Sequence, residues 1–159
     1  MKTHHKNSER LVTKVFQDVF DKYDLMNDLM SLGIHRLWKK NFINWLNPQK
    51  NTTLVDVASG TGDIAKLYLN KVNDKGSVCC VDENKDMLNL NKKKFKENTN
   101  IKWFCNNAEE LPFKKNCFDY YTISFGIRNV SNINNTLREA YRILKPGGRF
   151  LCLEFSKVK

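Results

Sequence analysis

The sequence lacks any long run of apolar residues, and this absence limits the kind of protein it can be. No stretch of about 18 apolar residues occurs in the 159-residue chain, so we expect no transmembrane helix. The opening residues, MKTHHKNSER, have no apolar centre and do not resemble a secretory signal. Internal repeats and low-complexity linkers are also missing, and the length suits one domain.

Paired cysteines of the kind that hold metal ions are missing too. The five cysteines form no Cys-x-x-Cys pair, and no histidine lies at metal-ligand spacing from any of them. They occur within apolar segments, which indicates reduced, buried thiols in a reducing compartment. We therefore expect no metal site.

Acidic residues are scarce relative to basic ones. The chain has 17 Asp and Glu against 27 Lys and Arg, a net charge of +10. Such an excess occurs in proteins that bind nucleic acids, anionic membranes or acidic substrates. The densest run, Asn91–Asn98, falls within a predicted helix, where its lysines would form a solvated face. Because no basic stretch is interleaved with aromatic residues, we expect no nucleic-acid partner.

Patterns typical of strands and helices alternate along most of the chain. The apolar segments that we interpret as strands are Thr53–Ala58, Ser77–Asp82, Ile101–Ala108, Phe118–Gly126 and Arg149–Phe155. Amphipathic helical patterns follow the first, second and fourth of them, and the last of these helices ends in KPGG. Alternation of this kind predicts an α/β fold, with a mostly parallel sheet, right-handed crossovers and helices on both faces.

Two further helical patterns precede the first strand. Apolar residues recur at three- and four-residue steps from Ser8 to Phe20, and a second series continues past Gly33 to Phe42. We therefore divide the chain into an N-terminal helical segment, residues 1–50, and a Rossmann-like core, residues 51–159, which together form one domain.

The most informative motif is DVASGTGDIA, residues Asp56–Ala65, because it follows a strand and opens a helix. Gly60 and Gly62 allow a sharp turn and a close approach of the backbone to a ligand. Asp82 ends the next strand, 20 residues after Gly62, where an acidic side chain can accept hydrogen bonds from ribose hydroxyls. The motif alone fits a dinucleotide site, the nucleoside site of S-adenosylmethionine enzymes, or a turn that only packs a helix onto a strand.

Later segments favour the S-adenosylmethionine interpretation. Asn107 and Ala108 follow the third strand, where an adenine could lie between apolar and amide groups. Ser124 lies near the end of the fourth strand, and Leu144–Gly148 closes the following helix. This ordered set resembles a class I methyltransferase. A nicotinamide-dependent reductase would need a dinucleotide site, which this context does not suggest.

Two longer stretches resemble the signatures of the ubiquinone/menaquinone biosynthesis C-methyltransferase family. The pattern Y-D-x-M-N-x-x-x-S-x-G-x-H-R-x-W spans Tyr23–Trp38, and R-x-L-K-P-G-G-x-x-x-x-x-E-F-S spans Arg142–Ser156. Between them, Ala108–Phe113 and Thr122–Val130 are also similar to the family. The resemblance covers nearly the whole chain.

The resemblance implies transfer of a methyl group from S-adenosylmethionine to a ring carbon of a polyprenylated benzoquinol or naphthoquinol, in ubiquinone or menaquinone biosynthesis. The sulfonium already activates the methyl group, so the reaction needs no metal. It implies that Asp82 holds the ribose, that Asn107 and Ala108 lie by the adenine, and that Thr61 and Ser124 line the pocket. The full set of cofactor-binding residues expected is Gly60, Thr61, Gly62, Asp82, Asn107, Ala108 and Ser124.

Two catalytic residues are also implied by the resemblance. Arg128, just past the fourth strand, would stabilise the phenolate of the quinol or orient a water that takes its proton; a structural ion pair is the alternative role. Tyr23 would be the second member, held in an N-terminal helical lid over the pocket, and a packing role is its alternative.

The chain departs from the family pattern at two places. Ser59 stands where the family usually has the first glycine of Ala-Gly-Gly-Thr-Gly-Asp, which matters if that position needs a positive φ. The family's sheet has seven strands, and this chain stops just past the fifth, so we expect the C-terminal strands of the family to be absent. This leaves a second interpretation open, a non-catalytic cofactor-binding or scaffold subunit of a quinone-synthesis assembly.

Partners and location follow from the same resemblance. A polyprenylated quinol substrate implies peripheral contact with a membrane, and a homodimer and a complex with other quinone-synthesis enzymes are further candidates. The expected location is the matrix side of the mitochondrial inner membrane if the source is a eukaryote, and the cytoplasm if it is a bacterium.

Overall fold

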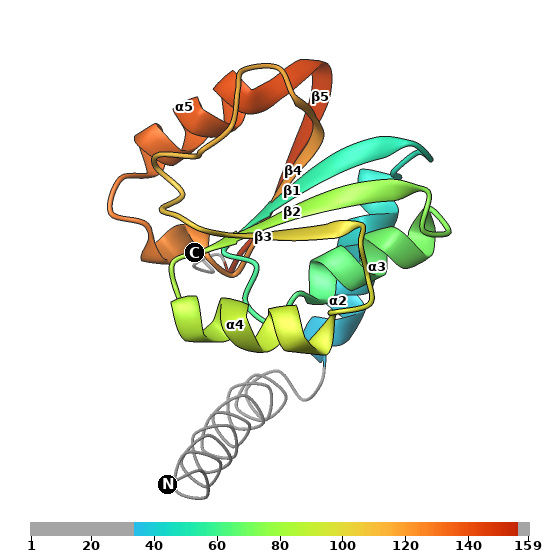
Figure 1. Ribbon diagram of the computed structural model, residues 1–159. Coiled ribbons are helices and arrows are strands. Elements are labelled where there is room, and N and C mark those ends of the chain that lie inside the picture. The colour runs from blue at the N-terminus through green and yellow to red at the C-terminus, as the bar shows by residue number, and fades with distance from the viewer. Residues whose placement is uncertain (1–33, 156–159) are drawn as a thin grey trace, which may run out of the picture. The chain divides into compact units, whose positions relative to one another are not determined.

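A parallel sheet of five strands forms the centre of the computed structural model, which describes residues 34–155 (Figure 1). The strand order is β3-β2-β1-β4-β5, and every neighbouring pair of strands is parallel. The strands are β1 (Thr52–Val57), β2 (Gly76–Asp82), β3 (Ile101–Cys105), β4 (Phe118–Ser124) and β5 (Leu144–Leu153). The predicted α/β class with a parallel sheet is therefore confirmed.

Helices connect the strands and cover both faces of the sheet. They are α2 (Ile34–Leu46), α3 (Asp63–Lys71), α4 (Lys85–Lys94), the short 3-10 helix η1 (Ile127–Asn129) and α5 (Ile133–Ile143). Two helices begin at a side-chain cap of the kind that satisfies a free backbone N–H. The side chain of Asn84 accepts a hydrogen bond from the N–H of Met87 at the start of α4, and that of Asn132 accepts one from Asn135 at the start of α5.

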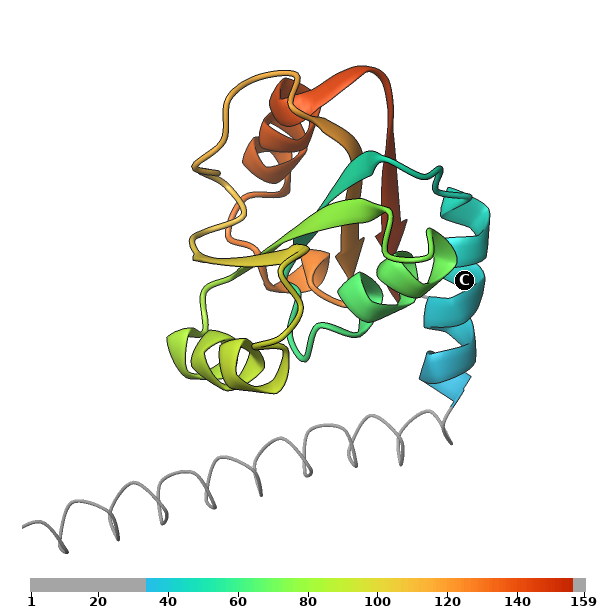
Figure 2. The ribbon, with the colours of Figure 1, turned by 45° about the vertical axis from the view of Figure 1, so that its right-hand side comes forward.

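The two faces of the sheet bury different side chains, because successive residues of a strand point to opposite sides. Leu54 of β1 packs on the face covered by α3 and by the part of α2 that follows Lys39, where Tyr68 and Phe42 are buried. Val55, the next residue of β1, packs on the face covered by α5. Figures 1 and 2 show α3 and α5 on opposite sides of the sheet.

Strand β5 begins earlier than the sequence predicts. We expected it at Arg149, after a KPGG turn, but it begins at Leu144 and includes that segment. Phe118 of β4 pairs with Leu144 and Tyr120 pairs with Arg149, so Lys145–Gly148 bulge out opposite Asp119. Gly147, with a φ of 80°, supplies the left-handed residue that such a bulge uses.

Strand β3 ends earlier than expected, at Cys105 rather than Ala108. The side chain of Asn107 accepts a hydrogen bond from the N–H of Glu109 at 2.7 Å, a local turn that competes with extension of the strand.

The expectation that all five cysteines are buried was wrong for two of them. Cys80 is buried in the core, and Cys79 and Cys117 are half-buried, but Cys105 and Cys152 are exposed. Both exposed thiols lie on β3 and β5, which form the edges of the described sheet. The side chains of edge strands have fewer neighbours to cover them than those of central strands.

The ends of β1 and β4 approach each other closely. Ala58, just after β1, has a φ of 53°, and Phe125, just after β4, has a φ of 55°. Gly126 lies against Ala58 so tightly that a Cβ added to Gly126 would be 2.4 Å from the Cβ of Ala58. Only glycine therefore fits at position 126.

We expect Gly126→Ala to lower the free energy of unfolding by about 1–3 kcal/mol, because it overfills a closed contact. Ala58→Gly removes the opposing methyl group and also relieves a left-handed alanine, which costs roughly 1–2 kcal/mol. The double variant should therefore recover most of the stability lost in Gly126→Ala. Urea unfolding of the two single variants and the double variant measures this, and a double variant no more stable than Gly126→Ala would contradict the contact.

Candidate functional site

The carboxyl ends of β1, β2 and β4 meet at one edge of the sheet. The order β2-β1-β4 places the reversal of strand order between β1 and β4, which is where open α/β sheets bind ligands. The turn Gly60–Gly62 follows β1, Asp82 ends β2 and Ser124 ends β4. The fold thus brings together the residues that the sequence predicted for a cofactor site from three separate segments.

The two glycines of the turn are needed for different reasons. Both are left-handed, with φ of 50° at Gly60 and 79° at Gly62. A Cβ on Gly62 would lie 2.9 Å from the ring of Trp103, so this glycine permits α3 to pack closely. Among residues 34–155, no atom lies within 4 Å of a Cβ built on Gly60. The turn therefore has open space beside Gly60, which a ligand can occupy.

The replacement of a family glycine by Ser59 does not strain the turn. Ser59 does not have a positive φ, whereas Ala58, just before it, has a φ of 53°. The Ser59 side chain is buried, and its hydroxyl has no hydrogen-bond partner within the described residues. The left-handed residue is therefore Ala58, and a serine at position 59 is not strained.

Asp82 is bound to the turn by a direct hydrogen bond. Its Oδ2 accepts from the N–H of Gly60 at 2.8 Å, and its Oδ1 accepts from the N–H of Asn84 at 2.9 Å. Each carboxylate oxygen can accept two hydrogen bonds, so both retain a free lone pair. Asp82 is half-buried and can still accept from the two hydroxyls of a ribose.

Asp56 is a candidate residue that the sequence reasoning missed. It is 2% exposed, and its Oδ1 accepts a hydrogen bond from the hydroxyl of Thr122 at 2.8 Å. Its Oδ2 has no hydrogen-bond partner within residues 34–155. Burial raises the pKa of Asp56 to about 7, while the Thr122 hydrogen bond and the charge of Lys39 oppose that rise. A carboxylate inside a buried strand, just before a glycine turn, is the signal that could have identified it.

A third carboxylate beside the turn is paired. Asp63, the first residue of α3, forms an ion pair with Lys39 at 2.8 Å. Burial alone would raise the pKa of Asp63, but the Lys39 charge and hydrogen bonds from Lys39 and Thr61 hold it below its ordinary value. Asp63 therefore has a cationic partner and Asp82 has backbone donors, whereas Oδ2 of Asp56 has no partner in the part of the chain that the structure describes. An unsatisfied buried carboxylate oxygen suits a ligand that brings its own donor or positive charge.

The loop after β3 places the expected adenine contacts near the same edge. Ala108 is buried, whereas Asn107 is exposed and its side chain is engaged in the local turn with Glu109. The carboxylate of Glu109 accepts a hydrogen bond from the N–H of Asn132 at 2.8 Å. This contact ties the loop to the start of α5 and so fixes its position relative to the strand ends.

Arg128 lies in η1, just past β4, and is engaged in an ion pair. Its guanidinium is 2.8 Å from a carboxylate oxygen of Glu154, and its side chain is 48% exposed. It also lies 5.4 Å from the centre of the Phe155 ring. The pair is the contact expected of the structural role that the sequence left as an alternative. Tyr23, the other expected catalytic residue, lies outside the described residues.

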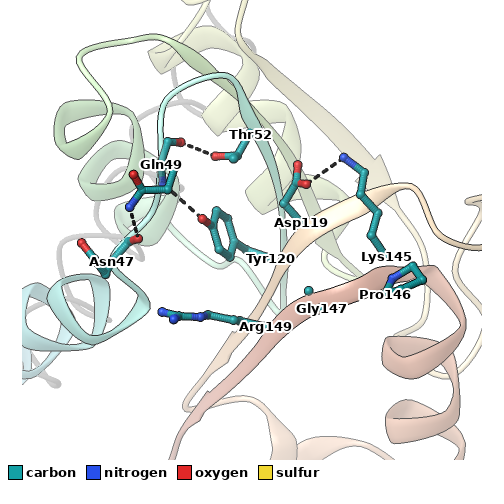
Figure 3. Close-up of a pocket in the computed structure, with 10 residues that line it drawn as sticks. Asn47, Gln49, Thr52, Asp119, Tyr120, Lys145, Pro146, Gly147 and Arg149 are labelled. Carbon is teal, nitrogen blue, oxygen red and sulfur yellow. Dashed lines mark hydrogen bonds and ion pairs between the residues drawn. The ribbon is translucent and has the colours of Figure 1, made fainter.

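A separate cavity of about 260 Å³ lies at the opposite edge of the sheet, where β1 and β4 begin (Figure 3). Its polar lining includes Tyr120, whose hydroxyl accepts a hydrogen bond from the N–H of Gln49 at 3.1 Å. It also includes the ion pair between Lys145 and Asp119 at 2.8 Å. The cavity therefore contains none of the residues of the glycine turn.

Residues 34–155 contain neither a cluster of metal ligands nor a helix that could span a membrane. No group of three or more His, Cys, Asp or Glu side chains in this part of the chain is arranged to hold a metal ion. No helix in the same range is long and apolar enough to cross a membrane.

The parallel order of the strands, the glycine turn after β1 and the acidic end of β2 together define the fold of a class I methyltransferase. The chain belongs to the ubiE/COQ5 methyltransferase family, whose model matches residues 2–159.

Curated relatives agree with the family assignment. The chain is 54% identical over 164 residues to the ubiquinone/menaquinone biosynthesis C-methyltransferase UbiE of Rickettsia prowazekii (strain Madrid E), a match that covers 99% of this chain and 66% of the relative. It is also 54% identical over 165 residues to the protein of the same name from Rickettsia bellii (strain OSU 85-389), covering 100% of this chain and 65% of the relative. This chain thus spans slightly less than two thirds of the length of these relatives.

Solved structures share the fold. A SAM-dependent methyltransferase from Aquifex aeolicus superposes with a TM-score of 0.69 at 20% identity, covering 76% of this chain and 65% of that one. The YcgJ protein from Bacillus subtilis has a TM-score of 0.68 at 26% identity, covering 76% of this chain and 50% of that one. At such identities the Aquifex structure supports the fold alone, and it agrees with the sheet described above.

The unpaired carboxyl of Asp56 predicts a pH-dependent stability in the absence of ligand. The folded state keeps the proton of Asp56 up to about pH 7, whereas the unfolded state releases it near the ordinary value of 3.8. Between these values the folded state binds more protons, so its stability falls as the pH rises, in total by as much as about 4 kcal/mol. We expect Asp56→Asn to remove this contribution and to gain stability relative to the parent as the pH rises towards 7.

Urea unfolding of the ligand-free protein at several pH values between 4 and about 8 tests this expectation. The difference in unfolding free energy between Asp56→Asn and the parent should grow with pH and level off above pH 7. A difference that stays constant over this range would contradict a neutral, buried Asp56.

Proposed function

We propose that this chain is the cofactor-binding part of a methyltransferase that acts on a quinol. It would transfer a methyl group from S-adenosylmethionine to a ring carbon of a polyprenylated benzoquinol or naphthoquinol. Its curated relatives are named as C-methyltransferases of ubiquinone/menaquinone biosynthesis, which supports this reaction. The observation that carries the proposal is the hydrogen bond between Gly60 and Asp82, beside open space at the carboxyl ends of β1 and β2. Family membership supports the same function.

The described residues fit this cofactor. Asp82 has free lone pairs for the ribose hydroxyls, and the space beside Gly60 lets the ligand approach the backbone. The unpaired oxygen of Asp56 suits the cationic end of a sulfonium amino acid. When bound, S-adenosylmethionine supplies an activated methyl group. The protein then has to hold the ring carbon in line with it and favour loss of the quinol proton.

The roles of Arg128 and Tyr23 remain part of the proposal. Arg128 would stabilise the phenolate or orient a water, with Tyr23 in the lid of residues 1–50 over the core of residues 51–159. If Arg128 acts in this way, the pair with Glu154 holds the guanidinium at the end of β4. The same pair is the observation that favours the second candidate function, a non-catalytic cofactor-binding or scaffold subunit, because it gives Arg128 a structural role.

Partners and location are proposed on the same basis. A polyprenylated substrate implies contact with a membrane surface, and a homodimer and a complex with other quinone-synthesis enzymes stay predictions. The relatives described above are bacterial, which favours the bacterial cytoplasm over the mitochondrial location.

We expect Asp82→Ala to weaken binding of S-adenosylmethionine by roughly ten- to a hundredfold, since it loses hydrogen bonds to a charged acceptor, worth about 1.5–3 kcal/mol. Titration calorimetry of the parent and the variant measures the change. Glu83→Ala is a matched control, because it removes one negative charge from the exposed residue next to Asp82 and leaves Asp82 in place. Equal affinity in the parent and Asp82→Ala would refute the ribose assignment.

In a full-length version of the protein, we expect Arg128→Ala to lower turnover of a short-tailed quinol by roughly 10²–10⁴, the range typical of proton-transfer groups. Its affinity for S-adenosylmethionine should stay close to that of the parent. Glu154→Gln separates the two roles of Arg128, because it keeps the guanidinium and removes its anionic partner. If Arg128→Ala and Glu154→Gln lower the unfolding free energy by the same amount and also lower turnover by the same factor, Arg128 is a structural residue.

A further inference from the structure

Helix α4 buries one polar side chain that packing does not explain. Leu88 and Asn91 lie one turn apart on the same face of the helix and are 1% and 0% exposed. Leucine is common in such a position, whereas asparagine is mostly exposed unless its amide is bonded. The lysines that follow, Lys92–Lys94, lie in the exposed last turn of the helix.

The amide of Asn91 is bonded to the glycine turn. Its Nδ2 donates to the carbonyl oxygen of Gly60 at 2.6 Å. The N–H of the same residue, Gly60, donates to Asp82 at 2.8 Å. The backbone of Gly60 is therefore held at both its polar groups, by β2 on one side and by α4 on the other.

The two hydrogen bonds restrain Gly60, whose backbone dihedral angles would otherwise change at little cost in free energy. Gly60 has a φ of 50°, and without a Cβ it can adopt many other conformations at small cost. No atom of the described residues lies within 4 Å of the position of its missing Cβ, so packing by this part of the chain does not hold it either. Rotation about the φ and ψ bonds of Gly60 would change the angle between its N–H and its carbonyl, so that a carbonyl released from Asn91 would let the N–H leave Asp82.

The bond adds little to the stability of the fold. The Oδ1 atom of Asn91 is buried and has no hydrogen-bond partner within the described residues. An unsatisfied buried acceptor destabilises a protein by at least as much as a single hydrogen bond stabilises it. An apolar residue of the same size would avoid that penalty, so the asparagine is explained better by the turn than by stability.

We propose that Asn91 is a positioning residue of the cofactor site. Its amide holds the Gly60 carbonyl, which keeps the Gly60 N–H on Asp82 and leaves the free lone pairs of Asp82 directed at the ribose. This inference rests on the proposed function, since it takes an adenosine-containing ligand as the occupant of this edge of the sheet.

Asn91→Leu tests the inference, because leucine has a similar size and cannot donate. We expect the dissociation constants for S-adenosylhomocysteine and for adenosine, measured by calorimetry, to rise by the same factor, roughly tenfold for one hydrogen bond. We expect the unfolding free energy in urea to stay unchanged or to rise, which a purely structural role would not produce. Affinity within about twofold of the parent, or a loss for only one of the two ligands, would overturn the proposal.

Leu88→Ala is the matched control on the same face of α4. It creates a cavity and should lower stability, but it leaves the bond to Gly60 in place. Under conditions where it is folded, its affinity for S-adenosylhomocysteine should equal that of the parent. If it loses as much affinity as Asn91→Leu, the effect comes from loosening of α4 and the proposal fails.

The Gly60 amide resonance in an NMR spectrum gives a readout that needs no ligand. It should shift in Asn91→Leu and in the smaller variant Asn91→Ala, and stay in place in Leu88→Ala. Failure of the parent itself to bind either ligand would refute the proposed function. Even then, an unchanged Gly60 resonance in both Asn91 variants would separately refute the role of Asn91.

Discussion

The hydrogen bond from the backbone of Gly60 to the carboxylate of Asp82 is the contact on which the candidate site depends. It joins the turn after β1 to the end of β2, two segments that are 22 residues apart. The parallel pairing of β1 with β2 places both ends at the same edge of the sheet, where the left-handed Gly60 donates its N–H to the acid. Asn91 then restrains the other side of the same residue, so three elements determine one turn.

Charge around this turn is distributed unevenly. Asp63 is paired with Lys39, and Asp82 accepts from two backbone N–H groups. Asp56 is buried and has one hydroxyl donor, while its other oxygen has no partner among residues 34–155, and burial raises its pKa to about 7. A buried carboxyl that lacks a hydrogen-bond partner lowers the stability of the protein without ligand. Binding of a cationic ligand would supply that partner and raise the stability again.

Much of the fold could be predicted from the sequence because its signals are local. The order of strands and helices follows from apolar alternation and from glycine turns, and the strand starts at Thr52, Gly76, Ile101 and Phe118 lie within one residue of the prediction. The start of β5 could not be predicted, because KPGG is typical of a turn and the pairing of Leu144 with Phe118 extends the strand. The exposure of Cys105 and Cys152 depends on their place at the edges of the described sheet.

By itself the sequence determined the class of the fold, the glycine turn and Asp82 as its acidic partner, since these depend on the order of residues along the chain. Only the tertiary structure decided which groups complete the turn. Asn91 lies in a lysine-rich helix that the sequence presents as a solvated face, and Asp56 lies within a strand where it could have been paired. Arg128 likewise meets Glu154 only because β4 and β5 are neighbours. Burial and hydrogen bonding between distant segments set these contacts, and neither is encoded in local spacing.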